Sequence, residues 1–125
     1  MNVPLCQVKE IPEEGAKIAD FFEREVIALK VEGQLKVYLN ICPHLGGSLR
    51  REGNKLICQS HHSEFDCRNG QCLRGPAHPQ SRLLHVPTFV EEGVLTYAAD
   101  FDNQKGDIFA QILPILIRQN DDEHT

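Results

Sequence analysis

The chain has 125 residues, 25% of them charged, and a formal net charge of −5. This length fits a single domain that can bury a core of its own. The acidic balance, with no Lys/Arg-rich block, argues against binding to nucleic acid phosphates. The start, Met1 to Glu10, has no signal-peptide pattern, and the longest apolar stretch, 108–117, is half the roughly 20 residues that a membrane-spanning helix needs. We therefore expect a cytoplasmic protein with no membrane insertion.

In chain order, the elements read as β-strands. Residues 1–22 favour one or two strands around the turn "PEEG". Residues 26–40 and 83–100 each read as a hairpin around a Glu-Gly turn, and residues 65–73 hold Asn-Gly, a strong hairpin signal. Residues 101–107 read as a loop before the apolar and acidic tail. Short strands at close intervals, without an amphipathic helix, predict an all-β sandwich or barrel.

Two short phrases, "CPH" and "CQSHH", place a cysteine near a histidine twice. Cys42 and His44 form the first pair, and Cys58 and His61 the second, with thirteen residues between the pairs. Structural zinc sites usually pair like ligands at each end or use mostly cysteine. One ligand of each kind per loop suits a [2Fe-2S] cluster with two thiolates on one iron and two imidazoles on the other. Zinc on the same residues, or four ordinary loop residues, remain the alternatives.

The wider pattern resembles the Rieske family. Residues 40–77 contain "CPHLGG", a turn glycine, "C-x-x-H", "FD", a second turn glycine and "GPA", and the likeness extends over about residues 3–100. It implies a Rieske fold, a small antiparallel sandwich or barrel with an inserted cluster-binding subdomain of two loops. The implied domain is 1–105, with the cluster-binding loops at about 41–79 and an extension at 106–125. The implied cofactor is one Rieske-type [2Fe-2S] cluster on Cys42, His44, Cys58 and His61, with Leu45, Gly46, His62, Ser63, Phe65 and Pro76 close to it.

Several positions depart from what the resemblance implies. His62 stands where the family usually has glycine, which would allow a positive φ, so we expect His61 to be the ligand and His62 a bystander. Gly47 and Ser60 occupy the positions of the disulfide found in high-potential members, and Phe65 replaces their tyrosine donor. Ser63 keeps a hydroxyl donor position. Fewer donors predict a reduction potential of about −150 mV or somewhat above.

Cys67 and Cys72 flank Asn69-Gly70. A two-residue turn there would make the two cysteines face each other. Either they form a cross-strand disulfide, or they are two small half-buried side chains, as is usual in a reducing compartment.

The resemblance implies a one-electron carrier between a flavin-dependent reductase and a terminal oxygenase or other oxidoreductase, and not an enzyme. With about fifty residues after "GPA", we expect no second, catalytic iron domain. A small Rieske subunit of a nitrite-reductase-type enzyme and a redox-sensing module are the alternatives. The apolar segment 108–117 must find a surface, either on its own domain, on a second copy in a homo-oligomer, or on the redox partner.

Overall fold

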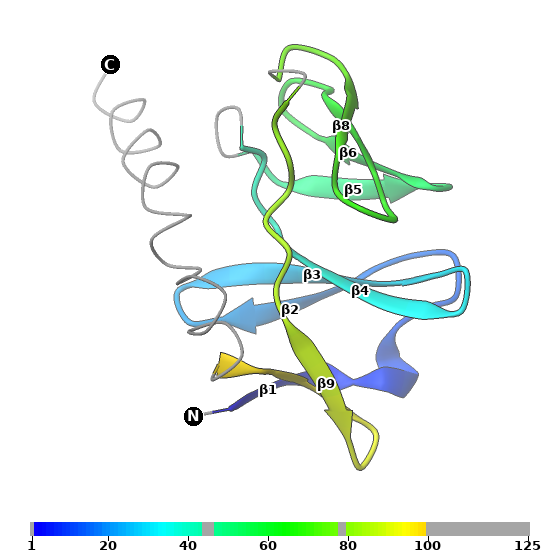
Figure 1. Cartoon of the computed structure of the whole chain (residues 1–125), viewed down its shortest axis with the longest axis vertical. Helices are drawn as coiled ribbons and strands as arrows, with labels where there is room; N and C mark the ends of the chain where they lie inside the picture. The colour runs from blue at the N-terminus through cyan, green and yellow to red at the C-terminus, as the bar shows by residue number, and fades with distance from the viewer. Residues whose placement is uncertain (1, 44–46, 78–79, 100–125) are drawn as a thin grey trace.

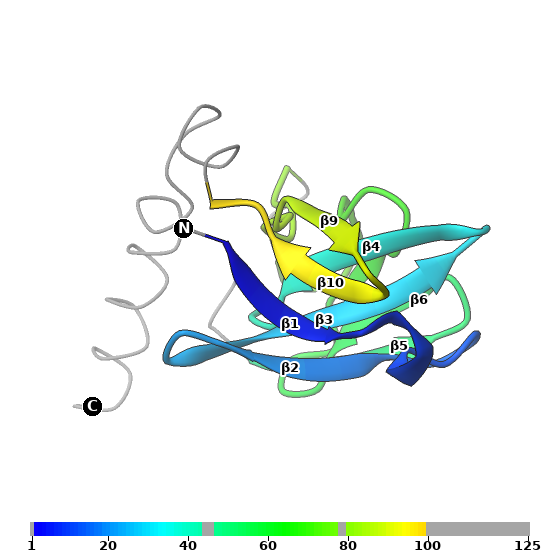
Figure 2. The same ribbon diagram turned by 90° about the horizontal axis from the view of Figure 1, so that it is seen from below.

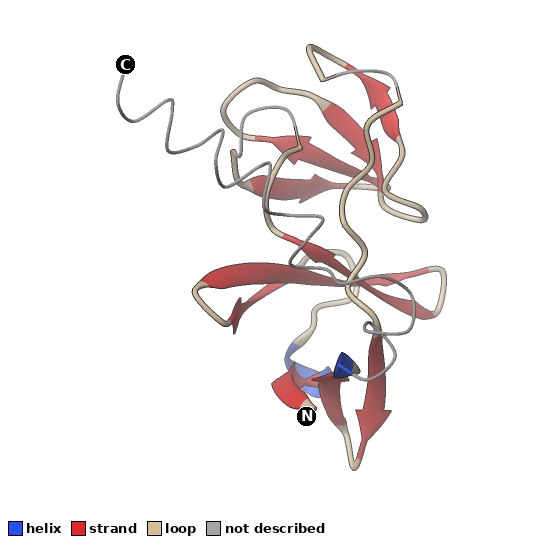
Figure 3. Ribbon diagram, turned by 60° about the vertical axis from the view of Figure 1, so that its left-hand side comes forward, coloured by secondary structure: helices blue, strands red, loops and turns tan. Residues whose placement is uncertain are grey.

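The computed structural model describes residues 2–43, 47–77 and 80–99. Its strands are β1 (Val3–Gln7), β2 (Lys17–Phe21), β3 (Arg24–Val31), β4 (Gln34–Leu39), β5 (Leu49–Glu52), β6 (Lys55–Cys58), β7 (Glu64–Asp66), β8 (Cys72–Arg74), β9 (Thr88–Glu91) and β10 (Val94–Tyr97), with a short 3-10 turn, η1 (Val8–Glu10). Strands dominate the described chain (Figure 3). The all-β prediction is confirmed.

The strands form three antiparallel sheets arranged in layers, ordered β1-β10-β9, β2-β3-β4 and β5-β6-β7-β8. Figure 1 shows β2-β3-β4 in the middle, with β5 to β8 above it and β1, β9 and β10 below. Figure 2, seen from below, shows β1, β9 and β10 lying across the middle sheet. The four-stranded sheet is inserted between β4 and β9, so it is the inserted subdomain that the resemblance implied.

The middle sheet is buried on both faces, which explains the nearly continuous apolar sequence of β3. Val26 and Ala28 contribute to the lower core, which lies against β1 and β10. The alternating residues Ile27, Leu29 and Val31 contribute to the upper core, shared with the inserted sheet. Side chains of successive strand residues point to opposite faces, so one strand serves both cores.

The two predicted hairpins form around their Glu-Gly turns. Val31 pairs with Gln34 across Glu32-Gly33, and both turn residues have positive φ, 52° and 80°. Glu91, the last residue of β9, pairs with Val94 across Glu92-Gly93, whose φ values of 51° and 78° are also positive. Two-residue loops with positive φ match the natural twist of a hairpin.

The turn between β7 and β8 differs from the prediction. Phe65 pairs with Cys72, and the Gly70 N–H donates to the Asp66 carbonyl, which gives a longer turn. Cys67 therefore does not face Cys72, and both thiols are free and buried. The two-residue turn does not form, and of the two alternatives the cysteines are small buried side chains without a disulfide.

The inserted sheet is fastened to the middle sheet by buried polar contacts. The Tyr38 hydroxyl donates to the Cys67 carbonyl at 2.8 Å. Arg51 donates through Nη1 to the carbonyls of Gly15 and Lys30, at 3.0 and 2.9 Å. These bonds satisfy backbone oxygens that the ladders leave unpaired, and they fix the subdomain on its base.

Candidate metal centre

The first loop leaves β4 and returns to β5, and one side-chain and one backbone hydrogen bond connect its two ends. The Leu49 N–H donates to Asn40 Oδ1 at 2.8 Å, and the Cys42 N–H donates to the Gly47 carbonyl at 2.7 Å. Cys42 is fully buried. His44, Leu45 and Gly46 lie outside the described residues, so their predicted roles remain predictions.

The second loop joins β6 to β7 and starts at Cys58, which is also fully buried. The His62 N–H donates to the Cys58 carbonyl at 2.8 Å, and the Cys58 N–H donates to the Ser63 carbonyl at 2.9 Å. The two bonds wrap residues 59–62 into a compact turn. Gln59 then joins this loop to the first one, since its N–H donates to the Ser48 carbonyl at 2.9 Å.

The two loops come into direct contact at Gly47. A Cβ at this position would lie 2.8 Å from the Cys58 sulfur and 2.9 Å from the Ser60 hydroxyl oxygen. The space next to the Cys58 thiol is therefore open only because residue 47 has no side chain. Gly47 and Ser60 lie face to face, and neither can form a disulfide.

His61 and His62 occupy different environments. His61 is half-buried, and its Nδ1 atom is buried. His62 is exposed and has a φ of 64°, the left-handed geometry that its glycine-like position suggested. A nitrogen inside the loop suits a ligand, whereas an exposed imidazole suits a surface residue.

A third segment, residues 74–77, lies against the second loop. Ser63 is 0% exposed, and its hydroxyl oxygen accepts the Ala77 N–H at 3.0 Å. Gly75 has a φ of +110°, and a Cβ there would lie 2.6 Å from the Ser63 Cα. Among the other residues expected near the cluster, Phe65 is fully buried in the upper core, whereas Pro76 is exposed.

The donor set fits a binuclear cluster better than a single metal ion. Within residues 2–43, 47–77 and 80–99, no three His, Cys, Asp or Glu side chains are arranged to hold a metal. In a Rieske cluster each iron takes only two protein ligands, so such a group of three is not required. Two buried cysteines, one on each contacting loop, and the inward Nδ1 of His61 fit a [2Fe-2S] group.

The remaining cysteines are poor ligands. Burial raises the pKa of the Cys67 thiol to about 11 and also raises the pKa values of Cys6 and Cys72. Since the thiolate is the form that binds metals, and these thiols stay protonated near neutral pH, they are poor candidates for ligands.

The helices of the described segments include none long and apolar enough to cross a membrane.

Comparison with known proteins agrees with this geometry. Residues 1–97 match the family model of the Rieske [2Fe-2S] domain. The ferredoxin component of the alkene monooxygenase system of Xanthobacter autotrophicus is 34% identical over 73 residues, which are 55% of this chain and 60% of that protein. The chain thus spans less than two thirds of that relative.

Solved structures share the fold. A ferredoxin of Sphingomonas yanoikuyae B1 superposes with a TM-score of 0.67 at 21% identity, covering 78% of this chain and 97% of that one. The terminal oxygenase of carbazole 1,9a-dioxygenase from Novosphingobium sp. KA1 superposes with a TM-score of 0.64 at 18% identity, covering 77% of this chain and 29% of that one. With the family model matching 97 of 125 residues, this chain belongs to the Rieske [2Fe-2S] domain family, and its cofactor is one [2Fe-2S] cluster.

Proposed function

We propose that the protein is a one-electron carrier and not itself an enzyme. The cluster would be held by the thiolates of Cys42 and Cys58 and the imidazoles of His44 and His61. When bound, such a cluster supplies one-electron oxidation and reduction. The protein would hold it between two loops that are joined by a hydrogen bond and close packing, and that exclude water from the side of the two cysteines.

The observation that carries the proposal is the difference in burial around the expected ligands. Cys42 and Cys58 are fully buried, whereas His61 is half-buried between exposed Ser60 and His62. A partner docked on the histidine side would therefore come closest to the cluster there. This arrangement serves electron exchange between proteins and does not require a substrate pocket.

A large hollow beside the first loop does not contradict this function. It has a volume of about 530 Å³ and is lined by Asp20, Phe22, Glu23, Arg24, Glu25, Leu39, Asn40 and Ile41. None of the expected ligands that the structure describes lines it. The hollow is open and rich in polar side chains, unlike the mostly apolar pockets that bury small substrates.

The proposed partners are a flavin-dependent reductase as electron donor and a terminal oxygenase or related oxidoreductase as acceptor. The support is the relative from Xanthobacter autotrophicus, which is the ferredoxin component of an oxygenase system. We also infer a reducing compartment such as the cytoplasm, because none of the five cysteines, all within the described ranges, forms a disulfide.

The expected potential is in the low part of the Rieske range, about −150 mV or somewhat above. Phe65 has no hydroxyl, and Gly47 and Ser60 cannot form a disulfide across the loops. The Ser63 oxygen accepts the Ala77 N–H, which leaves its own hydrogen available for donation to the cluster. One hydroxyl donor would stabilise the reduced cluster less than two.

The test is anaerobic purification followed by iron and sulfide analysis, EPR and potentiometric titration. We expect a red-brown protein with two irons and two sulfides per chain, as a [2Fe-2S] cluster requires. Its reduced form should give a rhombic EPR signal with an average g below that of all-cysteine clusters. A colourless protein with one zinc and no sulfide would refute the proposed cofactor. A cluster that exchanges electrons with no flavin-dependent reductase would refute the carrier function.

A further inference from the structure

We propose that Glu64 is a positioning residue that, through Arg74, holds the cover loop, residues 74–77, against Ser63 beside the cluster site. The functional role of this contact rests on the proposed function, with a cluster at Cys42, His44, Cys58 and His61. The contact itself is a property of the protein and can be tested separately.

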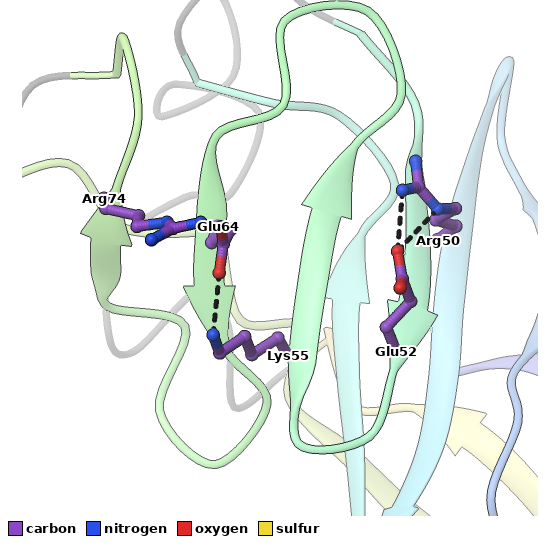
Figure 4. A network of polar contacts seen from close by, with 5 residues as sticks. All are labelled: Arg50, Glu52, Lys55, Glu64 and Arg74. Carbon is purple, nitrogen blue, oxygen red and sulfur yellow. Dashed lines mark hydrogen bonds and ion pairs between the residues drawn. The ribbon is translucent and has the colours of Figure 1, made fainter.

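Glu64 joins two cations from two different parts of the sheet. Its Oε1 accepts from Lys55 Nζ at 2.8 Å, and its Oε2 accepts from Arg74 Nε at 2.6 Å (Figure 4). The Glu64 side chain is only 12% exposed, whereas that of Arg74 is 77% exposed. Charge-assisted bonds to a poorly solvated carboxylate are stronger than those of ordinary surface pairs.

The same two contacts lower the pKa of the Glu64 carboxyl group. Hydrogen bonds from Lys55, and next from Arg74, lower the pKa of its carboxyl group below the ordinary value. Glu64 is therefore ionised throughout the neutral range, and both contacts persist there.

Each partner is the direct chain neighbour of one of the two residues that meet, Ser63 and Gly75. Glu64 follows Ser63, and Arg74 precedes Gly75. Glu64 and Arg74 form the last pair of the β7–β8 ladder, and the register shifts between Glu64 and Phe65. At such a bulge the backbone bonds alone fix the pairing less firmly. The ion pair therefore sets where the cover loop begins.

The cover loop packs so closely on Ser63 that a shift of Arg74, its first residue, would disturb the contact. Gly75 approaches Ser63 so closely that a Cβ would lie 2.6 Å from its Cα. The Ala77 N–H reaches the Ser63 hydroxyl oxygen at 3.0 Å. A loosened Arg74 would lengthen both contacts and admit water to the side of the site that Ser63 lines.

A neighbouring ion pair on the same sheet provides the matched control. Arg50 Nη2 and Glu52 Oε2 are also 2.6 Å apart, but both belong to β5 and connect no second strand (Figure 4). The Glu52 side chain is 55% exposed. Breaking this pair removes an ion pair of the same length, on a more exposed carboxylate, without releasing the cover loop.

The experiment compares Glu64→Gln, Arg74→Gln, the charge-conserving Arg74→Lys and the control Arg50→Gln with the unmodified, cluster-loaded protein. Hydrogen exchange is followed by mass spectrometry in peptides from the cover loop and from β5–β6. Bleaching by EDTA is followed in the visible spectrum. Reduction potentials are measured as a third readout.

We expect exchange at the Ala77 amide at least about tenfold faster in Glu64→Gln and Arg74→Gln, with protection in β5–β6 unchanged. Bleaching should be several-fold faster and the potential shifted in the same two variants. Arg74→Lys and Arg50→Gln should behave like the unmodified protein. Arg74 is mostly exposed, so Arg74→Gln stays informative if Glu64→Gln fails to fold.

Unchanged exchange in the cover loop would overturn the proposal, and so would exchange that rises equally across the whole sheet. If the unmodified protein held no cluster, the proposed function would fail. The exchange data would still decide the role of Glu64.

Discussion

Replacing Gly75 by alanine tests the close approach of the cover loop to Ser63. At a φ of +110° a side chain strains the backbone, which typically destabilises by about 1–2 kcal/mol. The new methyl carbon would also lie 2.6 Å from the Ser63 Cα and 3.1 Å from its Oγ. Overpacking of this kind typically adds about 1–3 kcal/mol. The combined loss is about 2–5 kcal/mol.

Gly33→Ala is the matched control, because Gly33 has a φ of +80° and a methyl group there would meet no atom of a non-adjacent residue within 4 Å. It should lose only the backbone contribution, about 1–2 kcal/mol. The difference between the variants, about 1–3 kcal/mol, isolates the steric contact with Ser63.

The assay is thermal unfolding of the cluster-loaded proteins under argon, followed by far-UV circular dichroism at one scan rate. For a small domain, 1 kcal/mol corresponds to about 4–8 °C in Tm. Gly75→Ala should therefore melt at least about 4 °C below Gly33→Ala. Equal melting temperatures would refute the reasoning, because they would mean that position 75 has room for a methyl group.

Three further predictions concern the ligands, acid stability and the tail. His61→Ala should abolish the visible cluster spectrum while His62→Gly preserves it; the reverse pattern would show that His62 is the ligand. The pKa of Glu64 is lowered on folding, so its stabilisation is complete above its ordinary value of 4.5 and is lost as the pH falls through the lowered pKa. Between about pH 6 and pH 3 the Tm of the unmodified protein should therefore fall more than that of Glu64→Gln, and parallel curves would contradict this. Deleting residues 106–125, outside the described residues, separates the alternatives for segment 108–117. Packing on its own domain predicts a lower Tm with unchanged assembly, whereas docking on a second copy or a redox partner predicts an intact spectrum and Tm with reduced self-association or electron delivery.

Local signals predicted much of this fold. Glu32-Gly33 and Glu92-Gly93 predicted two hairpins, and both form with a positive φ at each turn residue. The Cys-His spacing predicted which loops meet. At His62 the glycine-like position predicted the left-handed backbone, and φ is 64°.

Other features depended on contacts that sequence spacing does not reveal. Beside Asn69-Gly70, the Asp66 carboxylate accepts the Arg68 N–H and the Asn69 side chain accepts the Gln71 N–H. These local bonds favour a longer turn, which the dipeptide signal does not encode. The Lys55–Glu64–Arg74 network depends on a register that includes a bulge, so no pattern within one strand predicts it.

The inserted subdomain begins and ends close to β4, which determines how it could be replaced by another subdomain. The Leu39 N–H donates to the Leu84 carbonyl at 2.9 Å, so the inserted subdomain leaves and rejoins the base at neighbouring points. A different cluster-binding subdomain could therefore be inserted between Leu39 and Leu84 without distorting β4 or β9. The limiting factor is the upper face of the middle sheet. Its residues Ile27, Leu29 and Val31 would be exposed to water unless the replacement subdomain covered them with an apolar face of its own. Replacement of the inserted subdomain is thus limited by how well the new subdomain packs on this buried face, and not by the length of the connections.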